Sequence, residues 1–236
     1  MGGDANDLSG YGNDGVINGA EYVEDNCVFG GCFKFDGVDD RIVFNYFNVS
    51  DELSMFFWVY IESYVPRPSI IGQPGRFFLM IGNEGELYTW VRTNEGWHNS
   101  GLTEKYVVPL NVWKHLVITY SPDVMRYYID GDLIYEDKDN LTTGLIPQSF
   151  GNIYIGEENG RYFKGSIDEV SIYSRELHDL EVKVLYSVRK AQLYEQILVG
   201  GVKRIDVSDC NLKHGEIYNF VGFADNQKVD QEVIIR

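Results

Sequence analysis

Short alternating apolar segments, separated by glycine, asparagine and proline, fill the chain between residues 32 and 173. Alternation of apolar and polar side chains over a few residues is typical of antiparallel strands with one buried face. Asp130-Gly131 lies between two such runs and has the residue types that a two-residue hairpin needs. The pattern predicts an all-β jelly-roll sandwich of two antiparallel sheets. The expected strands are 32–35, 41–44, 53–61, 76–81, 86–92, 112–120, 124–129, 133–136, 152–155 and 165–173.

The spacing of the apolar residues changes after Ser174. Between residues 177 and 197 they recur at helical spacing, and Gly200-Gly201 follows as a stop signal, so we expect a helix over about 177–198. The segments 202–207, 216–222 and 229–235 have the composition of strands. We expect residues 1–186 to form the sandwich. Residues 187–236 are expected to form a C-terminal extension of helix and short strands packed on it.

The chain is strongly acidic, with 36 aspartates and glutamates against 20 lysines and arginines and a formal net charge of −16. Such a surface repels nucleic acid and anionic membrane, and it offers many oxygen ligands for Ca²⁺. Solubility is the ordinary role of that charge and is the alternative interpretation.

Three cysteines are too few for a disulfide framework. Cys27 and Cys32 are close in sequence, with Gly30-Gly31 between them, so they could bridge a tight hairpin if their Cα atoms come within disulfide range. Cys210 is then left over, either buried as a small apolar residue or free. The close pair favours an oxidising compartment.

Six segments, in order along the chain, resemble the motifs of one known family. They are Asp7-Leu8-Ser9-Gly10-Tyr11-Gly12-Asn13-Asp14-Gly15, Phe35-Asp36-Gly37-Val38-Asp39-Asp40, Leu53-Ser54-Met55-Phe56-Phe57-Trp58-Val59, Trp113-Lys114-His115-Leu116-Val117-Ile118-Thr119-Tyr120, Tyr128-Ile129-Asp130-Gly131 and Phe163-Lys164-Gly165-Ser166-Ile167-Asp168-Glu169-Val170-Ser171-Ile172-Tyr173. From residue 7 to about 186 the chain is similar to the laminin-G-like family of concanavalin A-like lectins and glucanases. The resemblance implies a jelly roll, and most members are binding, adhesion or carbohydrate-binding modules.

A calcium site is one expectation. Asp7 and Asn13 supply side-chain oxygens in a glycine-rich loop, where carbonyls can turn inward. The resemblance adds Asp168, because the aspartate of the family's closing strand commonly lies beside that loop. Such an ion would be structural. In the alternative interpretation, Asp7 and Asn13 close an Asx turn and Asp168 caps backbone amides.

A glycan site is the second expectation. Flat apolar sugar faces stack on aromatic rings, and sugar hydroxyls need nearby planar polar groups. Trp97 and His98 are expected in a polar loop, with Trp90 and Arg76 on neighbouring strands. For Trp90 a place in the core is about equally favoured. Trp58 and Trp113 are expected in the core.

No catalytic residues are predicted. The Glu-x-Asp-x-x-Glu arrangement of the wider fold's glycan-cleaving enzymes does not occur in the sequence, and neither does H-E-x-x-H or G-x-S-x-G. We expect a non-enzymatic module at the cell surface or outside the cell, binding a glycan or glycoconjugate, without direct membrane contact. A glycan-cleaving enzyme is the less favoured alternative. The other alternative is the soluble part of a pilin-like filament subunit without its N-terminal hydrophobic helix, able to self-associate, because Met1-Gly2-Gly3-Asp4 enters a loop with no first strand.

Overall fold

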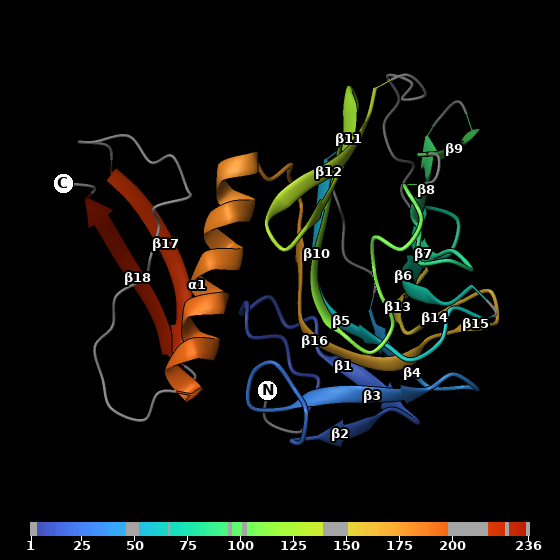
Figure 1. Cartoon of the computed structure of the whole chain (residues 1–236), viewed down its shortest axis with the longest axis horizontal. Coiled ribbons are helices and arrows are strands. Elements are labelled where there is room, and N and C mark those ends of the chain that lie inside the picture. The colour runs from blue at the N-terminus through green and yellow to red at the C-terminus, as the bar shows by residue number, and fades with distance from the viewer. Residues whose placement is uncertain are drawn as a thin grey trace. The chain divides into compact units, whose positions relative to one another are not determined.

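The protein folds into two units, and contacts divide the chain after Val182 (Figure 1). The computed structural model describes residues 4–45, 52–65, 67–93, 96–100, 103–138, 151–197, 217–224 and 227–234, with side chains up to residue 188. The first unit is the β-sandwich. The second contains most of the helix and a two-stranded hairpin.

Two antiparallel sheets of seven strands each make up the sandwich. Sheet A has the order β1 (Gly15–Asn18), β4 (Arg41–Phe44), β13 (Ile153–Ile155), β6 (Ser69–Gln73), β7 (Phe77–Ile81), β8 (Leu87–Thr93), β9 (Gly96–Asn99). Sheet B has the order β12 (Asp132–Asp137), β11 (Val124–Ile129), β10 (Trp113–Ser121), β5 (Leu53–Ile61), β16 (Lys164–Tyr173), β3 (Cys32–Asp36), β2 (Glu21–Val23). A short hairpin, β14 (Glu157–Glu158) and β15 (Arg161–Tyr162), follows β13. The expected two-sheet jelly roll is confirmed.

The core lies between the sheets, because alternate residues of the strands point inward. Phe57 and Val59 of β5, Phe77 and Leu79 of β7, and Leu116 of β10 are all fully buried in one apolar cluster. At the expected hairpin, Asp130 and Gly131 have φ values of 53° and 85°, as a type I′ turn requires. Strands β10 and β11 follow the expected 112–120 and 124–129 to within one residue.

Sheet B also buries part of its outer face. Cys27 and Cys32 form a disulfide, with their Cα atoms 5.5 Å apart. The loop that it closes, residues 27–32, is called the disulfide loop below. Its Phe29 ring packs edge-on against Trp58, with ring centroids 6.1 Å apart. Trp58 is therefore buried outside the central core rather than within it.

Several segments differ from the sequence expectation. Residues 96–99, expected in a polar loop, form the edge strand β9, and β1, β2 and β6 were not expected as strands. These strands are three to five residues long and contain polar residues or glycine, so their alternation is too short to recognise. Trp113, expected in the core, is half-buried, and its indole donates to the Asn26 carbonyl at 2.9 Å.

The second unit includes most of helix α1 (Asp179–Ile197), close to the expected 177–198, and the hairpin of β17 (Ile217–Ala224) and β18 (Gln227–Ile234). The expected strand at 202–207 lies outside the described residues. The packing of the extension from residue 187 onto the sandwich stays a prediction. Within the described residues, no helix has both the length and the apolar character needed to span a membrane.

Candidate functional site

Three aromatic rings meet on the outer face of sheet A. Phe78 pairs with Trp90 across β7 and β8, and their rings stack with centroids 6.1 Å apart at 27°. Trp97 of β9 leans across β8, so that its ring centroid lies 5.6 Å from that of Phe78. Because the neighbouring residues Phe77 and Val91 point into the core, these rings point away from it. We call Phe78, Trp90 and Trp97 the aromatic platform.

The platform remains accessible. Trp97 is 41% exposed, whereas Phe78 and Trp90 are partly covered. The stacked Phe78 and Trp90 rings, with Trp97 tilted beside them, form an apolar surface. Strand pairing holds the three residues in place. Such a surface suits the flat face of a sugar ring.

The platform belongs to a longer row. Strand register aligns one outward-facing residue from each of the seven strands: Val16, Val43, Tyr154, Gly72, Phe78, Trp90 and Asn99. Gly72 interrupts the row of side chains next to Phe78. The space above Gly72 is filled by Glu158, whose Oε2 lies 2.7 Å from the position that a β-carbon on Gly72 would take.

Glu158 belongs to the β14–β15 hairpin and is 2% exposed. Its Oε1 accepts a hydrogen bond from Asn159 Nδ2 at 2.8 Å. Burial, together with the negative charge of Glu157, raises the pKa of Glu158 to about 7 against the opposing effect of Arg161. A carboxyl group thus borders the platform on its β6 side.

The expected glycan residues are only partly brought together. Trp90 and Trp97 both contact Phe78 on one face, but Arg76 is 1% exposed and does not present its guanidinium to solvent. His98 pairs with Val91 and therefore lies on the opposite face of the sheet from Trp97. Its Nε2 lies 3.0 Å from the Thr93 hydroxyl.

The sequence interpretation missed Phe78 and Arg92. Phe78 lies within the apolar run Phe77-Phe78-Leu79-Met80-Ile81, where nothing distinguishes the outward residue until the register is known. Arg92 follows Trp90 by two residues, so alternation alone places both on one face. The expected strand 86–92 contains both residues, so this spacing would have placed Arg92 beside Trp90 from the sequence alone.

The expected calcium residues use their carboxylates in local hydrogen bonds. Asp7 accepts the Ser9 amide at 2.8 Å through Oδ1 and the Asn13 amide at 2.9 Å through Oδ2. Burial raises the pKa of Asp7, but these hydrogen bonds outweigh it and hold the pKa below its ordinary value. The contacts match the alternative interpretation of an Asx turn.

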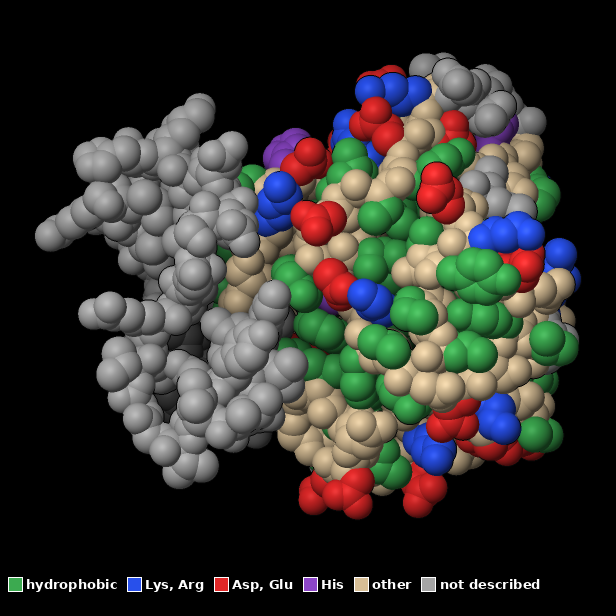
Figure 2. Space-filling view, viewed as in Figure 1, with side chains coloured by type: hydrophobic (Ala, Val, Ile, Leu, Met, Phe, Trp, Pro, Cys, Tyr) green, Lys and Arg blue, Asp and Glu red, His purple; other side chains and the backbone are tan. Residues whose placement is uncertain are grey.

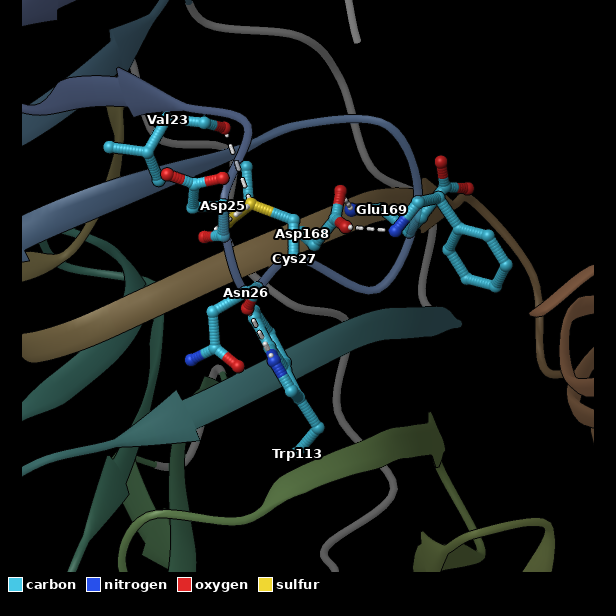
Figure 3. Close-up of a disulfide and its surroundings, with 9 residues drawn as sticks. Val23, Asp25, Asn26, Cys27, Trp113, Asp168 and Glu169 are labelled. Carbon is cyan, nitrogen blue, oxygen red and sulfur yellow. Dashed lines mark hydrogen bonds between the residues drawn. A yellow bond between two sulfur atoms is a disulfide. The ribbon is translucent and has the colours of Figure 1, made fainter. Parts of the chain in front are cut away.

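Asp168 is fully buried, and Figure 3 shows it beside Cys27 of the disulfide loop. Its Oδ2 accepts the Phe29 amide at 3.0 Å, and its Oδ1 accepts the Glu169 amide at 2.8 Å. Burial raises the pKa of Asp168 to about 7 in spite of these bonds. A carboxylate oxygen that accepts one hydrogen bond keeps a second lone pair, which is available to an ion. The calcium site at Asp7, Asn13 and Asp168 therefore stays a prediction.

Three other carboxylates, those of Asp36, Asp39 and Asp40, gather at the turn between β3 and β4. Asp40 accepts the Asp36 amide at 2.8 Å, and Asp36 accepts the Val38 amide at 2.7 Å. These bonds account for the cluster as turn structure.

Comparison with known proteins agrees with the fold. The family described as the concanavalin A-like lectin/glucanases superfamily matches residues 36–183. No curated protein matches the chain.

Solved structures similar to the chain have low sequence identity to it. The binding domain of Paraclostridial Mosquitocidal Protein 1 has a TM-score of 0.66 and 17% identity, covering 80% of this chain and 50% of that one. Domain 4 of AbnA, an extracellular arabinanase from Geobacillus stearothermophilus in complex with arabinotriose, has a TM-score of 0.62 and 20% identity, covering 78% of this chain and 93% of that one. The binding domain of botulinum neurotoxin serotype G has a TM-score of 0.61 and 19% identity, covering 78% and 48%.

The chain thus spans about half the length of the toxin domains and most of the arabinanase domain. At these identities the structural likeness establishes the fold. Together with the match over residues 36–183, the two facing seven-stranded sheets identify the chain as a member of the concanavalin A-like lectin/glucanase superfamily.

Proposed function

We propose that the protein is a non-enzymatic glycan-binding module and that the aromatic platform is its binding surface. The observation that carries the proposal is the meeting of Phe78, Trp90 and Trp97 on one face, with Trp97 41% exposed. A core role does not require these rings, because Phe77, Leu79 and Val91 already fill the interior side of the same strands. The arabinotriose complex of the structurally similar arabinanase domain is consistent with this use of the fold.

The proposed setting is outside the cell or at its surface. The Cys27–Cys32 disulfide supports it, since disulfides persist in oxidising compartments. The proposed partner is a glycan or glycoconjugate.

A glycan array followed by calorimetric titration tests the proposal. Trp97→Ala should weaken binding of any positive glycan by about tenfold or more, because a stacking contact is lost. Tyr106→Ala is the matched control, since Tyr106 is 65% exposed and lies in the 103–112 loop. Absence of binding to every glycan, or equal binding by Trp97→Ala, would overturn the proposal.

A structural calcium ion at Asp7, Asn13 and Asp168 remains part of the proposal. Thermal unfolding with millimolar Ca²⁺ and with EDTA tests it separately. A bound ion should raise the midpoint, because it binds only the folded state, and Asp7→Asn should abolish the rise. An identical midpoint in both buffers would remove calcium and leave the glycan proposal standing.

A further inference from the structure

Arg92 is an exposed cation beside the aromatic platform. It lies on β8, two residues after Trp90 on the same face, and pairs in register with Trp97. Its Nη1 lies 4.0 Å from the position that a β-carbon on Gly75 would take, so the side chain reaches toward the turn between β6 and β7. The guanidinium therefore extends along the face that carries Phe78.

Many of the other cations have an acidic neighbour. Ion pairs join Lys34 to Glu62, Lys105 to Glu84, Lys114 to Asp130, Arg126 to Glu136 and Glu176, Lys138 to Glu136, and Arg175 to Glu181. On the face seen in Figure 2, several basic side chains lie beside acidic ones. Arg92 forms no such pair within the described part of the chain, although acids outnumber bases by 36 to 20.

A guanidinium presents its donors in a planar fork that matches a carboxylate. We propose that the platform binds a glycan carrying carboxylate groups, an inference that rests on the proposed function. Arg92 pairs with one carboxylate while the sugar ring stacks on Trp97. A uronate or sialate unit has this combination of a ring and an acidic group.

The acid on the other side of the platform supports one orientation for such a ligand. Glu158 lies over Gly72, beside Phe78, and a ligand carboxylate placed there would meet a like group. The Arg92 guanidinium lies toward Gly75 in the turn between β6 and β7, so the acidic group of the ligand should lie at that end of the platform. A densely charged polyanion fits less well, because the net charge of −16 repels it.

The test compares matched glycans that differ only in charge. Oligosaccharides bearing glucuronate, galacturonate or sialate are titrated beside their carboxyl-reduced counterparts. The wild type should bind at least one acidic member about tenfold more tightly than its reduced form, the effect expected for a hydrogen bond to a charged group. Raising salt should shrink that preference, since the pair is exposed.

Arg92→Gln should abolish the preference for the acidic form and retain the binding of the reduced form. Arg92→Lys should keep part of the preference, because it retains the charge without the fork. Lys34→Gln, which removes a 51% exposed cation from β3 of sheet B, is the control and should change neither. Circular dichroism and thermal unfolding confirm that each variant folds.

The outcomes separate the two proposals. Equal binding of acidic and reduced glycans by the wild type, or a preference that survives Arg92→Gln, would overturn the role of Arg92 and leave glycan binding intact. Tighter binding to a single-stranded nucleic acid than to any glycan would overturn both, as would the absence of all glycan binding.

Discussion

Both sheets place a tryptophan on the face turned away from the core, but the two side chains have different surroundings. Trp58 on β5 of sheet B is 5% exposed under Phe29 of the disulfide loop. Trp97 on β9 of sheet A is 41% exposed beside Phe78. The same residue type therefore serves packing on one sheet and a surface on the other, and the difference arises from the segment that covers sheet B.

The disulfide loop and its neighbour Asn26, which lie over sheet B, hydrogen-bond to residues far away in the sequence. The Phe29 amide donates to Asp168, and Trp113 donates to Asn26 (Figure 3). On the same face, the Tyr128 hydroxyl donates to Asp179 at 2.6 Å, at the start of α1. These bonds tie both ends of the first unit to the middle strands of sheet B.

Trp58→Ala should have the largest effect. Removing a buried tryptophan leaves a cavity between Phe29 and His115, and we expect the free energy of unfolding to fall by about 3–5 kcal/mol. Urea unfolding of the sandwich measures it. A loss below about 1 kcal/mol would mean that the packing of the disulfide loop on Trp58 adds little to stability.

Asp168 predicts a pH dependence. Its folded-state pKa of about 7 lies above the unfolded value near 4, so the folded state holds the proton more tightly between these values. The protonated Asp168 carboxyl group therefore adds about 2–4 kcal/mol to the free energy of unfolding below pH 4. This contribution is lost as the pH rises to about 7.

Unfolding free energies measured from pH 4 to 8 check this prediction. Asp168→Asn should reduce the fall in unfolding free energy over this pH range. Glu158→Gln should remove a further part of that fall, because Glu158 also has a pKa raised to about 7. If neither variant changes the slope, neither carboxyl group titrates as described.

Loss of the disulfide should have a smaller effect. Cys27 and Cys32 are separated by five positions, and closing so short a loop stabilises the folded state by about 2 kcal/mol. Urea unfolding of the Cys27→Ala/Cys32→Ala variant, and of the wild type under dithiothreitol, measures that loss. Glycan affinity should not change, and a matching loss of affinity would show that the two faces are coupled.

Trp97→Ala should have the smallest effect on stability, less than about 1 kcal/mol, because much of the ring is already in water. The same urea unfolding measures it against Trp58→Ala. A loss comparable to that of Trp58→Ala would make Trp97 a packing residue and weaken the platform as a binding surface.

The sequence alone was enough for the fold class. The aromatic and β-branched runs 53–61 and 124–129, and Asp130-Gly131 after the second run, are local signals, so the bounds of these two strands agreed with the structure. The proximity of Cys27 and Cys32 indicated their disulfide for the same reason, because five positions along the chain limit how far apart they can be. The helix from 179 also followed from its own spacing.

Tertiary structure decided which of these residues share a surface. Trp90 and Trp97 were recognised as aromatic residues in a polar stretch, but the register of β7, β8 and β9 added Phe78 and Arg92 and put His98 on the other face. A shift of one residue reverses every side chain of a strand, so a face cannot be assigned before pairing is known. The burial of Arg76 and Asp168 likewise depends on segments distant in sequence, such as Phe29 over Asp168, and local residue patterns do not encode those contacts.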